Sequence, residues 1–294
     1  MPAAPPVGLV GIGLMGEALA GRLLPAGLKV LGFDVDPGKI AHLAAVGGEA
    51  AGSVGDVARR CEIIVLAVFD TEQVEEVVER GILPALEGRS GKVVICTSTC
   101  DPDRIAALGA RAEAAGLAFV DAPVSGTSEQ VRTGRGVGLV GGSSEAVARV
   151  APVLDAFFLK HFHVGGIGDG GRTKLAVNLV LGLNRLALAE GLVFAERLGL
   201  DPTAFLQVAR DSAAYSQVME TKGGKMLSRD FAPEGRVRQT LKDVKLMLGQ
   251  AEGAGQRLPL LEVHADVLEA CVRAGEGDHD NSIVIEEIAR RKSR

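Results

Sequence analysis

Residues 8–16 read GLVGIGLMG, and residues 17–23 continue EALAGRL. The first stretch is apolar around three glycines, Gly11, Gly13 and Gly16, whereas the second has the composition of a helix. In a strand–turn–helix unit this GxGxxG spacing allows a tight turn at Gly11, the approach of a bound group at Gly13 and close helix packing at Gly16. The stretch therefore predicts a helix whose N-terminus faces a diphosphate.

The first half of the chain alternates short apolar runs with segments of helical periodicity. Seven runs are predicted strands: VGLVGI, KVLGFD, EIIVLAV, KVVICTS, LAFVDAP, VGLVGG and FFLKHFHVG. Helical segments lie between them, for example at 17–24, 39–46, 71–78 and 102–114. Strands that alternate with helices favour parallel pairing through right-handed crossovers, which predicts a doubly wound Rossmann sheet.

The pattern changes at GGIGDGG, after which long helices are expected at 173–197, 202–210, 238–250 and 259–273. We expect an α/β protein in which residues 1–164 form a nucleotide-binding domain and residues 165–294 an all-α domain for substrate binding and dimerisation. The segment Lys174–Leu198 is apolar on nearly every face. It predicts a long helix packed on all sides that joins both domains and reaches a subunit contact.

Composition narrows the possible partners and the location. The net charge of −5, with both signs interspersed, gives no field for nucleic acid. The opening MPAAPPVG lacks the basic cluster and apolar core of a leader, and Asn178, Asn184, Arg185 and Glu190 would make 175–194 costly as a membrane span. The four cysteines lack CxxC spacing. We therefore expect a cytoplasmic protein without nucleic-acid or membrane partners.

Asp34 ends the second predicted strand, roughly 20 residues after the glycines. At that place a carboxylate accepts hydrogen bonds from both ribose hydroxyls of an adenosine and repels a 2′-phosphate. Val35 follows where a phosphate site would favour arginine. NAD is therefore favoured, with NADP possible, and a bare strand-to-helix turn is the structural alternative. Asp36 with Pro37 is expected to cap the next helix.

Five blocks in order resemble the β-hydroxyacid dehydrogenase family, which includes 3-hydroxyisobutyrate dehydrogenase, tartronate semialdehyde reductase and part of 6-phosphogluconate dehydrogenase. They are GLVGIGLMGEALAGRLLPAG, STCDP, FVDAPVSGTSEQVRTG, the GxGxxxKxxxN of 168–178, and LKDVKL. The resemblance covers nearly the whole chain. It implies an oligomer, a homodimer or homotetramer, and a small carboxylate substrate.

The resemblance also assigns roles to residues. The implied catalytic pair is Lys174 and Asn178, and the implied substrate loop is Ser125, Gly126 and Thr127, used together with that pair. The expected cofactor contacts are Gly11, Ile12, Gly13, Leu14, Met15, Gly16, Asp34, Val68, Phe69, Ser98, Thr99 and Lys242. Ser98 and Thr99 could instead cap the helix that begins near Pro102, and Lys242 could be a surface lysine paired with an acid.

Lys174 suits the chemistry that hydride transfer requires. Oxidising an alcohol needs a base for the hydroxyl proton, and reducing a carbonyl needs the same group as an acid. An ammonium at the start of an apolar helix, near an oxidised nicotinamide, is expected to release its proton readily. Asn178 lies one turn further on the same face and can hold the substrate oxygen, so no metal is needed. The alternative is a solvated lysine that happens to begin a helix.

The substrate loop departs from the family's usual Ser-Gly-Gly. Thr127 adds bulk and a donor, and Glu129 adds negative charge, so the loop is expected to select its own substrate. Without a third ligand, His161 and His163 are expected to be structural or surface residues, not metal ligands.

The sequence thus predicts an NAD(P)-dependent oxidoreductase of the 3-hydroxyisobutyrate dehydrogenase-related type, acting on a small 3-hydroxy acid or its semialdehyde. The enzymatic alternative is NADPH-dependent reduction of a small aldehyde, such as glyoxylate or succinic semialdehyde, or of an imine. Imine-reducing relatives generally lack the lysine. A non-catalytic nucleotide-binding module has no need of Lys174 and Asn178.

Overall fold

The computed structural model describes residues 5–86, 88 and 91–291. The first four residues, on which the leader prediction partly depends, lie outside this range. By its contacts the chain divides into two compact units, residues 1–174 and 175–294. The first contains β1 (Val7–Val10), α1 (Leu14–Leu23), β2 (Val30–Phe33), α2 (Pro37–Ala45), β3 (Glu49–Ala50), α3 (Val54–Arg60), β4 (Ile63–Leu66), α4 (Thr71–Glu76), the π-helical turn η1 (Val77–Ile82), the 3-10 turn η2 (Leu83–Leu86), β5 (Lys92–Cys96), α5 (Pro102–Ala114), β6 (Leu117–Asp121), β7 (Val124–Ser125), α6 (Ser128–Arg132), β8 (Val137–Gly141), α7 (Ser144–Phe157) and β9 (Lys160–Gly165).

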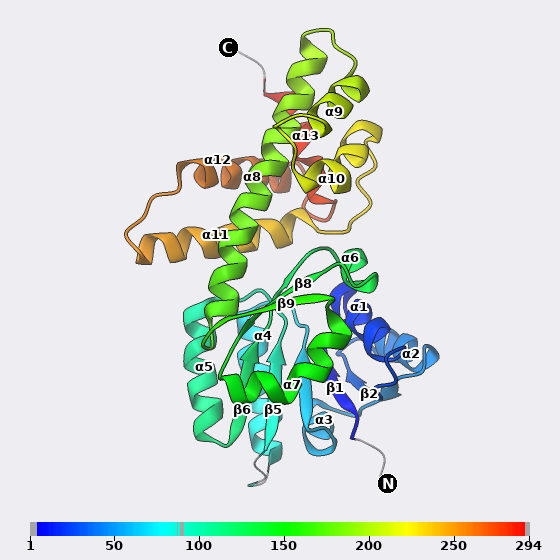
Figure 1. Cartoon of the computed structure of the whole chain (residues 1–294), viewed down its shortest axis with the longest axis vertical. Coiled ribbons are helices and arrows are strands. Elements are labelled where there is room, and N and C mark those ends of the chain that lie inside the picture. The colour runs from blue at the N-terminus through cyan, green and yellow to red at the C-terminus, as the bar shows by residue number, and fades with distance from the viewer. Residues whose placement is uncertain (1–4, 87, 89–90, 292–294) are drawn as a thin grey trace. The chain divides into compact units, whose positions relative to one another are not determined.

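Within the described residues, nine strands form one sheet in the order β3-β2-β1-β4-β5-β6-β8-β7, with β9 paired to β8 (Figure 1). The strands from β3 to β6 are parallel, and their order is that of a doubly wound dinucleotide-binding sheet. The predicted fold class is confirmed. Ligands of such sheets bind at the carboxyl ends of the strands where the strand order reverses, which here is between β1 and β4.

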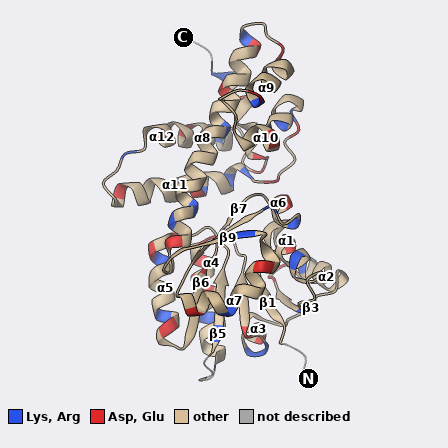
Figure 2. Cartoon of the chain, in the orientation of Figure 1, with Lys and Arg blue, Asp and Glu red and all other residues tan. Residues whose placement is uncertain are grey.

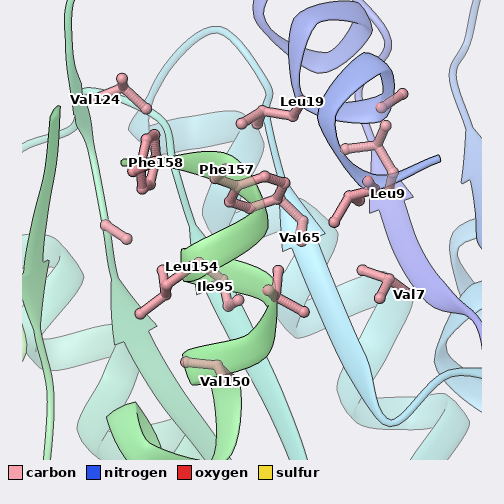
Figure 3. Packing of buried hydrophobic residues seen from close by; sticks show 14 of the residues in the cluster. Val7, Leu9, Leu19, Val65, Ile95, Val124, Val150, Leu154, Phe157 and Phe158 are labelled. Carbon is pink, nitrogen blue, oxygen red and sulfur yellow. The ribbon is translucent and has the colours of Figure 1, made fainter. Parts of the chain in front are cut away.

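Side chains on successive strand residues point to opposite faces and build two cores. Leu9, Val65 and Ile95 pack with α1 and α7 on one face, where Phe157 lies among them (Figure 3). Their neighbours Val10 and Leu66 face the other side, packing with α3 and α5. Because central strands are apolar on both faces, they are covered by helices on both sides. This burial fixes the register that places the loops at the carboxyl edge.

Two predictions about the sheet are wrong in detail. Uniform parallel pairing fails at β8, which is antiparallel to both β6 and β7. The chain reverses through the five-residue α6 and not through a full crossover helix. In addition, the strand expected from Phe157 onwards begins only at Lys160, because Phe157 is the last residue of α7 and both phenylalanines are buried in the core.

The second unit is helical. Its elements are most of α8 (Asp169–Arg197), then α9 (Pro202–Arg210), α10 (Gln217–Ser228), α11 (Val237–Gly253), α12 (Pro259–Arg273), the short turn η3 (Asn281–Ile283) and α13 (Val284–Arg290). An apolar core that includes Leu192, Met226 and Leu268 holds them together. The helix α10 is absent from the sequence-based expectations. Figure 2 shows basic and acidic residues interspersed along the elements of both units.

The long helix α8 was expected to be packed on every side, with a subunit contact among its neighbours. In the single chain it is not, because Val180 and Phe194 are 57% and 65% exposed. Among the described residues it is also the one helix long and apolar enough to meet the length and composition of a membrane span. However, it buries Arg185, and the buried side chains Leu186, Ala189 and Leu192 belong to the core of the second unit.

Candidate active site

The glycine loop joins β1 to α1. Gly11 has a φ of 90°, a conformation that favours glycine, and a Cβ there would lie 2.6 Å from the Ala67 carbonyl oxygen. A Cβ on Gly16 would lie 2.1 Å from the Gly11 carbonyl oxygen, so α1 packs directly on the loop. Gly13 differs, because a Cβ there meets no atom within 4 Å. As the N-cap of α1, Gly13 is open on the side from which a phosphate could approach.

The other residues of the loop have distinct surroundings. Ile12 is fully buried in the core, Met15 packs against that core, and Leu14 is 45% exposed. Of these three, Leu14 offers the most side-chain surface to a bound molecule.

Asp34 follows β2 at the same edge of the sheet. Its carboxylate accepts from the backbone N–H of Ile12 at 2.6 Å and from that of Asp36 at 2.9 Å. Asp34 therefore ties the glycine loop to the second strand. Val35 is 91% exposed. Asp36 accepts from the N–H of Gly38 at 2.8 Å, which confirms its predicted role as a helix cap.

The loops after β4 and β5 lie side by side, because these strands are parallel neighbours. Ser98 donates its hydroxyl to the Val68 carbonyl oxygen at 2.7 Å, and this bond joins the two loops. Phe69 is 50% exposed, and its N–H bonds to the Gln73 side chain at 2.9 Å.

The alternative role suggested for Ser98 and Thr99, capping the next helix, is wrong. The carboxylate of Asp101 caps α5 by accepting from Asp103 and Arg104 at 2.9 and 3.1 Å. Ser98 is thereby left with the bridging bond to the β4 loop.

The loop of Ser125, Gly126 and Thr127 begins at the last residue of β7. Thr127 is the N-cap of α6: its hydroxyl oxygen accepts from the N–H of Gln130 at 3.2 Å, and its own N–H donates to Gln130 Oε1 at 2.9 Å. The backbone donor of Thr127 is therefore already occupied. Glu129 forms an exposed ion pair with Arg132 at 2.5 Å, so the negative charge that it adds is partnered.

Lys174 lies in the second turn of α8 and is 6% exposed. The start of this helix is held by Asp121 at the end of β6, whose carboxylate accepts from the N–H groups of Gly168 and Gly171, each at 2.8 Å. The sequence-based reasoning missed Asp121. The signal was an acidic residue inside the apolar run LAFVDAP, because a buried carboxylate requires donors.

In the second unit, Asn178 donates its side-chain N–H to Asp243 Oδ2 at 3.3 Å. Because an ionised carboxylate only accepts, this contact turns the Asn178 carbonyl oxygen the other way. That oxygen is buried without a hydrogen-bond partner among the described residues. Lys242 lies 3.4 Å from the other oxygen of Asp243. The three side chains thus form one polar group, in which Asp243 is buried and Asn178 and Lys242 are partly buried.

The two histidines have structural partners. His161 contacts Asp155 at 3.0 Å, and His163 contacts the Gly142 carbonyl oxygen at 2.8 Å. Across the described ranges, no group of three or more His, Cys, Asp or Glu side chains could hold a metal ion. The four cysteines are free and buried.

Comparison with known proteins gives consistent matches along the chain. Residues 6–165 match the family model for the NAD-binding domain of 6-phosphogluconate dehydrogenase, and residues 168–288 match that for NAD-binding of NADP-dependent 3-hydroxyisobutyrate dehydrogenase. Glyoxylate/succinic semialdehyde reductase 2 of Arabidopsis thaliana is 28% identical, over 98% of this chain and 80% of its own. L-threonate dehydrogenase of Cupriavidus necator is 31% identical, over 95% and 94%. The crystal structure of 3-hydroxyisobutyrate dehydrogenase from Salmonella typhimurium superposes with a TM-score of 0.87 at 30% identity, covering 95% of this chain and 98% of that one.

Proposed function

The chain belongs to the β-hydroxyacid dehydrogenase family and is an NAD(P)-dependent oxidoreductase that acts on CH–OH groups; from this premise we propose its substrate class and the role of each site residue. The substrate is a small 3-hydroxy acid or the matching semialdehyde, and Lys174 is the general acid and base. The observation that carries this assignment is a buried lysine, Lys174, followed one helical turn later by Asn178, whose carbonyl oxygen has no hydrogen-bond partner among the described residues.

The glycine loop fits a dinucleotide. The first turn of α1 presents backbone N–H groups, and the open side of Gly13 lets a pyrophosphate reach them, whereas a side chain there would fill that space. The nicotinamide dinucleotide supplies the hydride donor or acceptor. We propose that Asp34 binds the adenosine ribose and that, with exposed Val35 beside it, NAD is preferred over NADP. Ser98 and Thr99, with Val68 and Phe69, contact the cofactor at the next two strand ends, and Lys242 contacts it from α11.

Lys174 exchanges a proton with the substrate oxygen. In the reducing direction hydride adds to the carbonyl carbon and the Lys174 ammonium donates a proton to the carbonyl oxygen; in the oxidising direction the neutral amine accepts the hydroxyl proton. Asn178 lies at i+4 on the same helix and offers its carbonyl oxygen as an acceptor. The second N–H of the same amide can donate to the substrate oxygen and hold that oxygen beside the amine. Asp243 fixes the amide in that orientation.

The carboxylate of the substrate is assigned to the loop after β7. Since the Thr127 N–H already bonds to Gln130, we assign the carboxylate to the Ser125 hydroxyl, the Gly126 N–H and the Thr127 hydroxyl, which can still donate. The nucleotide-binding part is assigned to residues 1–164 and the substrate and dimerisation part to residues 165–294.

A panel assay tests the substrate class. Oxidation of NADH and of NADPH is followed with small semialdehydes, with uncharged aldehydes of equal length and with a cyclic imine, and the reverse reaction with 2- and 3-hydroxy acids. The proposal expects the highest kcat/KM for a carboxylate-bearing semialdehyde and its 3-hydroxy acid, with NADH. Equal turnover of uncharged aldehydes would remove the carboxylate site. Turnover of the imine alone would favour the imine-reductase alternative, and no turnover at all would favour a non-catalytic module.

Reduction of glyoxylate or succinic semialdehyde with NADPH is the second candidate. It is favoured by the similarity to the Arabidopsis reductase of that name, which extends over 98% of this chain. The same panel separates the two candidates, because only the second predicts that NADPH and these two aldehydes give the highest kcat/KM.

We also propose that the protein is a cytoplasmic homodimer or homotetramer. The exposed apolar side chains of α8, Val180 and Phe194 among them, would be covered by a second copy. Light scattering after size-exclusion chromatography tests this proposal. A monomer at micromolar concentration would contradict it.

A further inference from the structure

Asp121 is a charged side chain in an unusual place. It is the last residue of β6, a strand with neighbours on both sides, and it is 3% exposed. Its two oxygens each accept one backbone N–H, from Gly168 and from Gly171 at 2.8 Å. These donors flank Asp169, the first residue of α8. The carboxylate therefore ties the sheet to the first turn of the helix that carries Lys174.

The neighbouring glycines hold this carboxylate closely. A Cβ on Gly170 would lie 2.8 Å from Asp121 Oδ2, and one on Gly141 would lie 2.3 Å from Oδ1. Gly168 has a φ of 94°, which favours glycine and directs its N–H to the carboxylate. The glycines before Lys174 in the GxGxxxK motif thus have a structural reason: they let the backbone close around Asp121.

A carboxylate here is energetically demanding. Burial raises the pKa of Asp121, although the two N–H bonds act in the opposite direction. The positive end of the helix dipole compensates part of the desolvation. A neutral hydroxyl could cap the same helix without that cost. A hydroxyl offers one acceptor atom, whereas the Asp121 carboxylate offers two. Two acceptors fix both the position of the first turn along the helix axis and its rotation about that axis.

The rotation matters because of the helical spacing. Gly171 and Lys174 are three residues apart, so they lie on the same face of α8, about 4.5 Å apart along its axis at 1.5 Å per residue. Anchoring the N–H of Gly171 therefore fixes the direction in which Lys174 leaves the helix. Asn178 continues the same face one turn further on.

We infer that Asp121 is a positioning residue for Lys174: its carboxylate fixes the first turn of α8 and so holds the amine where it exchanges a proton with the substrate oxygen. The inference rests on the proposed function, in which Lys174 is the acid and base. Asp121 touches neither substrate nor cofactor in this account. Its effect is expected in kcat and not in binding.

Asp121→Asn tests the inference with little change in shape. The amide keeps one acceptor but directs an N–H at the second backbone N–H, so one of the two bonds is lost. Because a misplacement of about 1 Å can cost about a hundredfold in rate, we expect kcat to fall between about tenfold and a hundredfold. The substrate KM and the Kd for NADH should stay within about twofold, since this change removes no group that binds either molecule. Amide hydrogen exchange at residues 168–174 should accelerate.

The second arm places Asp121→Asn in the Lys174→Ala background. If Asp121 acts through Lys174, the residual rate falls no further there, whereas a general structural defect lowers it by the same factor in both backgrounds. Ser143→Ala is the matched control. It removes the cap of α7, a bond of 3.2 Å to the N–H of Ala146 in the same unit, and should leave kcat unchanged. Asp121→Ser, which is smaller and keeps one acceptor, enters the same assays should the asparagine variant not fold.

The outcomes separate the two claims. If Lys174→Ala lacks activity and Asp121→Asn retains the wild-type kcat, the positioning role is overturned and the proposed function stands. An equal loss of rate in both backgrounds, or unchanged hydrogen exchange at residues 168–174, likewise overturns the positioning role. Wild-type turnover by Lys174→Ala would overturn the proposed function, and the role of Asp121 with it.

Discussion

His264 on α12 is expected to make the second unit sensitive to acid. The side chain is 1% exposed, and a Cβ on Gly182 would lie 2.7 Å from its Cε1, so the ring packs directly on α8. Neither ring nitrogen has a hydrogen-bond partner among the described residues. Burial, and then the nearby charge of Arg185, lower the pKa of His264 to about 4 from 6.5. The folded protein therefore holds this imidazole neutral where an unfolded chain would protonate it.

The sign and size of the effect follow from that difference in pKa. Because the pKa of His264 is lower in the folded state, its contribution to stability is complete above about pH 6.5. That contribution is lost as the pH falls from about 6.5 to about 4, since only the unfolded state binds the proton in this interval. Between about pH 7 and pH 4.5 this linkage removes about 2 kcal/mol from the free energy of unfolding. His264→Phe keeps a ring on Gly182 but cannot titrate. It should lose about 2 kcal/mol less than the wild type over that interval.

Urea unfolding at the two pH values measures this difference. Circular dichroism follows the helices, and fluorescence of Tyr215, the single tyrosine in a chain without tryptophan, reports on the second unit. His42→Phe, an exposed position on α2, is the control and should keep the wild-type loss. Equal losses for His264→Phe and the wild type would refute the reasoning, whatever their stabilities at neutral pH.

Three further substitutions test other parts of the account. Asp34→Ala should raise the Kd for NAD about tenfold and that for NADP less, as measured by binding titration, because it removes the ribose acceptor and the charge opposed to a 2′-phosphate; a wild-type protein that prefers NADP would contradict this. Gln130→Ala frees the Thr127 N–H and should lower the KM for a carboxylate substrate about threefold to tenfold. Gln130→Glu keeps the cap but adds a negative charge, so the KM of that variant should rise. Equal KM values in the two variants would be inconsistent with a carboxylate at this loop. Lys222→Met removes the ammonium 2.9 Å from buried Asp280 and should cost about 3–5 kcal/mol in urea unfolding, and a loss below about 1 kcal/mol would count against the pair.

The fold and the glycine loop of the nucleotide-binding half could be predicted from the sequence, because the residues that determine them are close together in the chain. Glycines at fixed spacing, an apolar strand before them and Asp34 after the next strand each follow from short-range requirements, and the structure brings Gly11, Asp34 and Ser98 to one edge of the sheet. The capping box at Thr127 could also have been predicted, since Thr127 and Gln130 have its three-residue spacing. The sequence analysis treats this segment as a substrate loop and does not predict the cap.

The features that were missed depend on partners far along the chain. Asp121 bonds to donors 47 and 50 residues away, and no local pattern connects them. The antiparallel direction of β8 could not be predicted either, because a short apolar run has the same composition in a parallel and in an antiparallel strand. The sequence cannot tell which face of α8 is buried within the chain and which, as at Phe194, is left exposed in the single chain, because an apolar residue suits either a core or a subunit contact.

The measurement that bears most directly on the central claim is the pH dependence of steady-state turnover in the wild type, Lys174→Ala and Lys174→Arg, with NADH binding measured in parallel. We expect both variants to bind NADH as the wild type does and to lose more than about a hundredfold in kcat, arginine included, because a guanidinium does not release a proton at these pH values. A Lys174→Ala enzyme that turns over the same semialdehyde within about threefold of the wild-type rate would contradict the claim that this amine is the acid and base.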